Sequence, residues 1–177
     1  TLHEIQGESS ASPLNGMIVT THGVVTACYG TTFVLQDGIG PWNGLWVRGT
    51  TTPALRDSVT VTGRVTEDDG PGNLGSTVLV EAQVESTTPG AVLPDVYTID
   101  TAGVEAESLE GVLVRVVNAE CTDPDVGAGE WQVDDGSGAS RVGVLGYRAA
   151  ATLGSTYQVS GPVAYGSGRF KIEPRDS

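Results

Sequence analysis

The sequence predicts an all-β fold built from two tandem five-stranded barrels. A repeat carries most of this prediction: LRDSVTVTGRV (55–65) is written again as LGSTYQVSGPV (153–163). A repeat spacing of roughly 95 residues in a chain of 177 residues indicates one unit used twice. The 25 glycines and the short valine-rich runs between Ser, Thr and Gly are typical of strands joined by tight turns.

The repeat divides the chain into a first barrel (1–85), a linker (86–95) and a second barrel (96–177). Pro89 and Pro94 make the linker unsuited to regular structure. Because the linker is short, we expect the two units to touch.

The first elements are predicted as a short strand at Leu2–Ile5 and a long strand within GMIVTTHGVVTAC (16–28). Gly23 lies in the middle of this apolar run and predicts a bulge or sharp coil, which a strand shared by both sides of a small barrel requires. The link in the second copy (96–110) contains enough Ala and Glu for one or two helical turns.

The next hairpin alternates between two faces, because successive side chains of a strand point to opposite sides. The inward set is Phe33, Leu35, Leu45 and Val47. The outward set is Val34, Gln36, Trp46 and Arg48. The second copy keeps an inward set of Trp131, Val133, Val142 and Val144. Its outward residues differ, so the core is predicted to be fixed and the surface free to vary.

The anchor strand follows, with Val59 and Val61 inward and Gly63 at a bend. A fifth strand closes each unit, and in this strand Val78 and Val80 of the first copy are equivalent to Phe170 and Ile172 of the second. Five short strands with a glycine-bent first strand predict a Greek-key barrel of the OB type. A β-sandwich is the alternative, but it usually needs about seven strands.

The first half of the chain, roughly residues 1–82, resembles the OB-like domains found beside the catalytic domain in bacterial secreted nucleases. The matching stretches are HEIQG (3–7), SPLNG (12–16), GVVTA (23–27), FVLQDG (33–38) and VTVTGRVTE (59–67). The resemblance implies a non-catalytic accessory module that helps a secreted enzyme engage its substrate. It also implies an extracellular or cell-surface location, with the catalytic residues in a different domain.

Barrels of this type usually bind ligands on the outer face of strands two and three. The candidate ligand-binding residues there and in the adjoining loops are Tyr29, Gln36, Trp42, Trp46 and Arg48. An aromatic ring beside a guanidinium suits stacking of a base or a sugar. The alternative is that Trp46 is covered by the other domain or lies unused on the surface.

Charge weighs against nucleic acid, because 22 acidic residues face 9 basic ones and the formal net charge is −13. The acidic loops suggest calcium, which takes several oxygen ligands from a compact turn. The candidate ligands are Asp68, Asp69 and Asn73 in the first unit and Asp123, Asp125 and Glu130 in the second. Asp and Gly are also ordinary turn residues.

Three functions remain open at this stage. The first barrel binds single-stranded nucleic acid, the pair is a structural spacer or docks on another domain of its parent protein, or the aromatic residues bind carbohydrate. No catalytic motif and no run long enough to span a membrane is present in the sequence. Cys28 and Cys121 occupy comparable places in the repeats, and either a disulfide between them or two free thiols is compatible with the sequence.

Overall fold

Five strands of the first unit close into a barrel. The computed structural model describes residues 1–70 and 73–175, and the side chains of these residues except at positions 69, 70, 73 and 74. The strands are β1 (Ile18–Tyr29), β2 (Thr32–Gln36), β3 (Gly44–Gly49), β4 (Ser58–Gly70) and β5 (Asn73–Thr88). Their order around the barrel is β1-β2-β3-β5-β4, with β3 and β5 parallel. This closed barrel is consistent with the predicted OB-like fold.

The alternation predicted for β2 and β3 is confirmed. The side chains that fill the first core include Phe33, Leu35, Leu45 and Val47, all fully buried. Val59 and Val61 of β4 join them, as predicted. The equivalence drawn between Val78 and Phe170 is wrong, because Phe170 lies in the core of the second unit while Val78 packs in a separate cluster outside the first core. Leu79 is the residue of β5 that enters the core there.

Strand β1 serves both sides of the barrel. It pairs with β4 from Ile18 to Val24 and with β2 from Val24 to Tyr29. The register of the β1–β2 pairing shifts between Val25 and Ala27, two residues after the predicted position. Gly23 has a different role, because a Cβ there would lie 3.2 Å from the Cβ of Leu35. Its missing side chain lets β1 cross closely over β2.

The strand predicted at Leu2–Ile5 is a helix, α1 (Leu2–Gln6). A capping box fixes its start, because the Thr1 hydroxyl accepts from the backbone N–H of Glu4 and the Glu4 side chain binds back to residue 1. Leu2 and Ile5 are both buried and stand three residues apart, which puts them on one face of a helix. The spacing of these two apolar residues therefore matches the period of a helix rather than that of a strand.

The second unit is a six-stranded sheet with two short helical turns between its first two strands. Its elements are β6 (Tyr97–Thr98), η1 (Ala102–Val104), η2 (Glu107–Leu109), β7 (Leu113–Gly127), β8 (Glu130–Asp134), β9 (Ser140–Val142), β10 (Thr156–Gly166) and β11 (Arg169–Ile172). The two 3-10 turns confirm the helical turns predicted between residues 96 and 110. The sheet order is β10-β11-β9-β8-β7-β6, with an additional pairing between β10 and β7. A second closed barrel stays a prediction.

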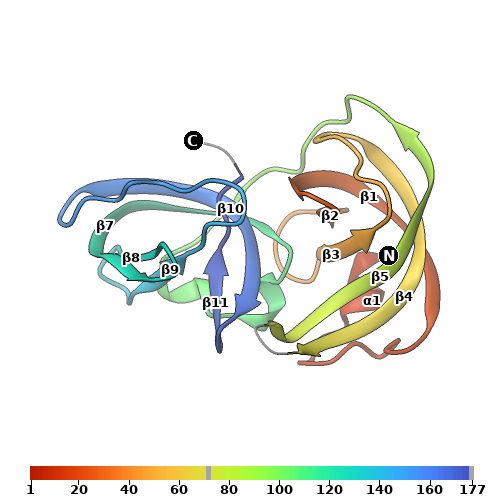
Figure 1. The fold of residues 1–177 in the computed structure, drawn as a ribbon, viewed down its shortest axis with the longest axis horizontal. Coiled ribbons are helices and arrows are strands. Elements are labelled where there is room, and N and C mark those ends of the chain that lie inside the picture. The colour runs from red at the N-terminus through yellow and green to blue at the C-terminus, as the bar shows by residue number, and fades with distance from the viewer. Residues whose placement is uncertain (71–72, 176–177) are drawn as a thin grey trace.

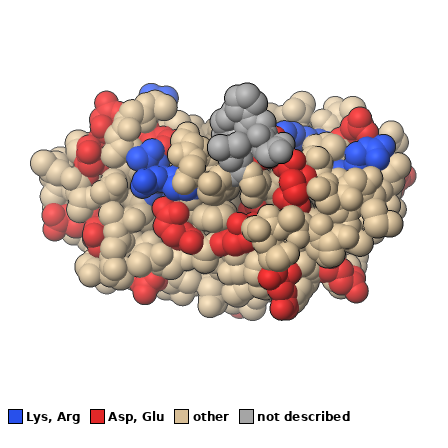
Figure 2. Space-filling model, turned by 90° about the horizontal axis from the view of Figure 1, so that it is seen from below, with Lys and Arg blue, Asp and Glu red and all other residues tan. Residues whose placement is uncertain are grey.

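The two units lie side by side (Figure 1). Gly44 at the start of β3 and Gly111 just before β7 bring the two backbones together, because a Cβ on Gly44 would overlap the carbonyl group of Gly111. The predicted contact between units is confirmed, whereas the exact domain boundaries stay a prediction. Acidic side chains are scattered over the face seen from below, with few basic ones (Figure 2). Within residues 1–70 and 73–175, no helix is long and apolar enough to cross a membrane.

Candidate functional site

The outer face of β2 and β3, where a ligand was predicted, is turned toward the second unit. Gln36 is fully buried there. Its side-chain oxygen accepts from the backbone N–H of Leu113 at 2.9 Å, and its amide nitrogen donates to the carbonyl of Gly38 at 2.6 Å. Both ends of the amide are therefore occupied, and one of them joins the two units.

Trp46 is also enclosed by the second unit, with only 6% of its surface exposed. Its indole Nε1–H donates to the carbonyl of Val163 on β10 at 3.0 Å. The Tyr29 ring stacks on the indole with 5.6 Å between centroids and 24° between planes. Ala164 of β10 packs in the same apolar cluster. The indole thus acts as a bridge between the units.

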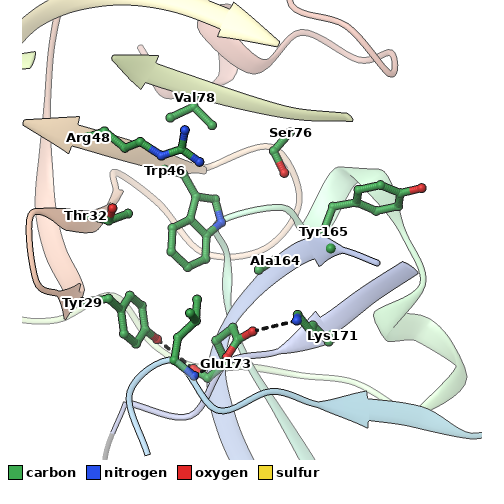
Figure 3. A pocket seen from close by; sticks show the side chains of 12 residues that line it. Tyr29, Thr32, Trp46, Arg48, Ser76, Val78, Ala164, Tyr165, Lys171 and Glu173 are labelled. Carbon is green, nitrogen blue, oxygen red and sulfur yellow. Dashed lines mark hydrogen bonds and ion pairs between the residues drawn. The ribbon is translucent and has the colours of Figure 1, made fainter. Parts of the chain in front are cut away.

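A cleft of about 220 Å³ remains beside this bridge, at the boundary of the two units (Figure 3). The barrel contributes Tyr29, Trp46 and Arg48, so three of the five predicted ligand-binding residues do meet at one place. The second unit contributes Tyr165 and Lys171 among others. The cleft is smaller than most ligand pockets, which span about 300–1,000 Å³.

The cationic groups of the cleft already have acidic partners. Arg48 forms an ion pair with Asp68 of β4. Lys171 forms ion pairs with Glu130 and with Glu173, the latter at 3.4 Å between Nζ and Oε1. These pairs offset the positive charge that an anionic ligand would need.

Glu173 is the most buried charged group of the cleft, with no exposed surface. Burial raises the pKa of its carboxyl above the ordinary value, opposed by the backbone N–H of Leu145, which donates to it at 2.9 Å, and by Lys171. Its backbone carbonyl accepts from the Tyr29 hydroxyl at 2.8 Å. Glu173 therefore holds the cleft together through both its side chain and its backbone.

The other predicted residues lie elsewhere. Trp42 does not line the cleft, and its backbone N–H donates to the carbonyl of Ser108 at 2.7 Å. Of the three aromatic residues predicted for carbohydrate binding, Tyr29 and Trp46 therefore line the cleft and Trp42 does not. Sequence reasoning missed Tyr165, Lys171 and Glu173, because β10 and β11 were assigned only to the core of their own unit. Lys171 is the single lysine of the chain, and this was the one signal available.

The structure describes the side chains of four candidate calcium ligands, Asp68, Asp123, Asp125 and Glu130, and does not gather three of them at one point. The side chains of Asp69 and Asn73 lie outside the described residues. Asp123 and Asp125 are exposed, and each accepts from the backbone N–H two residues further on, at 3.1 Å. Glu130 instead pairs with Arg141 and Lys171. Among the described side chains, no group of three or more His, Cys, Asp or Glu is arranged to hold a metal ion.

A buried carboxyl crosses the boundary at a point that the sequence did not reveal. Glu110 is 1% exposed, and its Oε2 accepts from the backbone N–H of Thr77 in the barrel at 3.1 Å. Its Oε1 has no hydrogen-bond partner among the described residues. Burial raises the pKa of Glu110 to about 8, and the nearby carboxylates of Glu107 and Glu67 add to the effect. Glu110 is therefore protonated at neutral pH.

Both cysteines are free within the described part of the chain. The thiol of Cys28 donates to the carbonyl of Pro53 at 3.3 Å, and Cys121 is buried in the second core. Burial raises the pKa of both thiols. Neither is positioned as a reactive thiolate.

Comparisons with known proteins do not assign a family. No family model matches the sequence, and no curated protein matches it. A solved structure described as "Structural mimicry for functional antagonism" is similar at 14% identity and a TM-score of 0.43. The match covers 96% of this chain and 94% of that one. A likeness this weak supports no conclusion about fold or function.

Proposed function

We propose that the chain is a non-catalytic accessory module of a secreted bacterial protein, in which two docked OB-like units serve as a structural spacer or protein-interaction unit. The observation that carries this proposal is the bridge made by Trp46. Its indole is enclosed at the unit boundary and bonded to Val163, so the face that such barrels use for ligands serves here to fasten the second unit.

The contacts across the boundary favour two units docked against each other over two units connected only by the linker. Gln36 accepts one bond across the boundary, and Trp46 and Tyr29 each donate one. In addition, Arg175 donates to the carbonyl of Thr26 at 2.8 Å. Each such bond contributes about 1 kcal/mol, and leaving its partner buried and unpaired costs more. The net charge of −13 favours a basic or neutral protein partner over a polyanion.

The test is a titration of labelled single-stranded DNA with the full chain at low salt, with and without calcium. We expect no saturable binding in either condition. Binding that weakens with added salt would contradict the proposal, because it would show that the protein contacts phosphates. Salt-insensitive binding of a glycan in a parallel titration would equally contradict it and favour a carbohydrate module.

Single-stranded nucleic acid binding is the second candidate, favoured by the stacked pair of Tyr29 and Trp46 beside Arg48 at the cleft. Stacking on aromatic side chains with cationic neighbours is the usual chemistry of such sites. If DNA does bind, Arg48→Gln should weaken it severalfold. Arg64→Gln is the matched control, since Arg64 is an exposed arginine of β4 outside the cleft. Equal effects of the two variants would exclude the cleft as the DNA site.

A further inference from the structure

A second cavity lies within the second unit and shares no lining residue with the cleft. Its volume is about 680 Å³, which falls in the range of pockets for small organic ligands. Its walls come from β7, β8 and β10 and from the segments 147–150 and 174–175. No motif in the sequence pointed to it.

One wall of this cavity is aromatic. Trp131 and Tyr157 meet edge to face, with 4.8 Å between ring centroids and 66° between planes. The Tyr157 hydroxyl accepts from the backbone N–H of Thr152 at 2.9 Å, which fixes the ring. Tyr147 also lines the cavity and is 39% exposed. Trp131 itself is only 2% exposed, so the rings of Tyr157 and Tyr147 are the flat apolar surface that a ring-shaped ligand can contact.

The polar groups of the cavity are mainly donors. Arg115 is held by a hydrogen bond from its Nε to the Ser160 hydroxyl at 3.1 Å. The Nε1–H of Trp131 is buried and has no hydrogen-bond partner among the described residues. An indole N–H can only donate, but this one has almost no exposed surface, so the donor that a ligand in the cavity can reach is the Arg115 guanidinium.

The charge of this lining is opposite to that of the chain. Two arginines, Arg115 and Arg175, line the cavity, and no Asp or Glu is among the described residues that line it. The whole chain carries 22 acidic residues against 9 basic ones. A hollow whose described lining carries arginine and no carboxylate favours an anion over a cation, in contrast to the acidic chain as a whole.

We propose that this cavity binds a small ring compound bearing one carboxylate, with the carboxylate at Arg115 and the ring against Tyr157 and Tyr147. The planar fork of a guanidinium matches a carboxylate through two parallel hydrogen bonds. A doubly charged phosphate would call for more cationic groups than the cavity presents. The ring is either saturated, as in a uronic acid, or planar, as in an aromatic acid.

The test titrates the full chain with glucuronate, benzoate and glucose, followed by calorimetry and by tryptophan fluorescence. We expect at least one of the two acids to bind saturably and glucose not to bind. Preference for glucuronate identifies a sugar acid as the ligand class, and preference for benzoate identifies a planar acid. Arg115→Gln should lower the affinity about tenfold or more, because a charge-assisted contact is lost. Arg64→Gln, which removes an exposed arginine of the barrel, should leave it unchanged.

Several results would overturn the proposal. These are no saturation by either acid into the tens of millimolar, glucose binding as well as the acids, or equal affinities for Arg115→Gln and Arg64→Gln. If Arg115→Gln does not fold, Arg115→Lys takes its place, because lysine keeps the charge but lacks the planar fork. That variant should still bind severalfold more weakly, and wild-type affinity would refute recognition by the guanidinium.

Discussion

Replacing Glu110 by glutamine should remove a large part of the pH dependence of this protein's stability. Glu110 is buried at the boundary of the two units, and its carboxyl accepts from the backbone N–H of Thr77. Glutamine has the same shape, keeps an oxygen for Thr77 and cannot ionise. The variant therefore tests the charge at this position without changing the packing.

The size of the effect follows from the pKa of Glu110, which burial raises from an ordinary value of 4.5 to about 8. Between these values the folded protein holds a proton that the unfolded chain has released, so the free energy of unfolding falls as pH rises. The fall is about 1.4 kcal/mol per pH unit, or about 5 kcal/mol over the whole interval. Stability from this group is complete below pH 4.5 and lost once the pH has passed about 8.

The assay is urea unfolding of wild type and Glu110→Gln at several pH values between 5 and 9. The wild type should lose stability relative to the variant steadily up to about pH 8, after which the difference should stay constant. Glu85→Gln, which removes an exposed carboxylate of β5, controls for the loss of one negative charge. Parallel profiles for wild type and Glu110→Gln would refute the reasoning.

Three further variants test the docking of the units and one loop. Gly44→Ala places a Cβ against the Gly111 carbonyl, so it should lower the free energy of unfolding by about 1–3 kcal/mol or more. An unchanged urea midpoint would show that the two units shift apart to accommodate the added methyl group. Trp46→Phe removes the bond to Val163 and should cost about 1 kcal/mol or more by the same measurement, whereas no loss would mean that the bridge is not used in solution. Asp135 has its pKa lowered to about 2, chiefly by hydrogen bonds from nearby hydroxyl groups. Asp135→Asn should therefore be less stable than wild type above pH 4, and this difference should vanish as the pH falls to about 2; a difference independent of pH would contradict the assignment.

Part of the candidate site could be predicted because neighbouring strands bring alternate residues to one face. Trp46 and Arg48 on β3 were expected to point away from the core, and Tyr29 was expected beside them; all three line the cleft. Trp42 was grouped with them by proximity in the sequence, but its turn leads it to Ser108 instead. The place of Lys171 in the cleft could not be foreseen, because the barrel supplies the facing residues. The role of Glu110 at the boundary could not be foreseen either, because its hydrogen-bond donor, Thr77, belongs to the other unit.

The sequence by itself determined the core of the barrel. Side chains alternate along a strand with a period of two, so the positions of Phe33 and Leu35 relative to Gln36 are fixed locally. Only the tertiary structure decided what covers the outer face. Val163 meets Trp46 across 117 positions of chain, and contacts of that range depend on how two folded surfaces fit together. No local sequence pattern distinguishes an outward tryptophan that is exposed for ligand binding from one that is covered by a neighbouring unit.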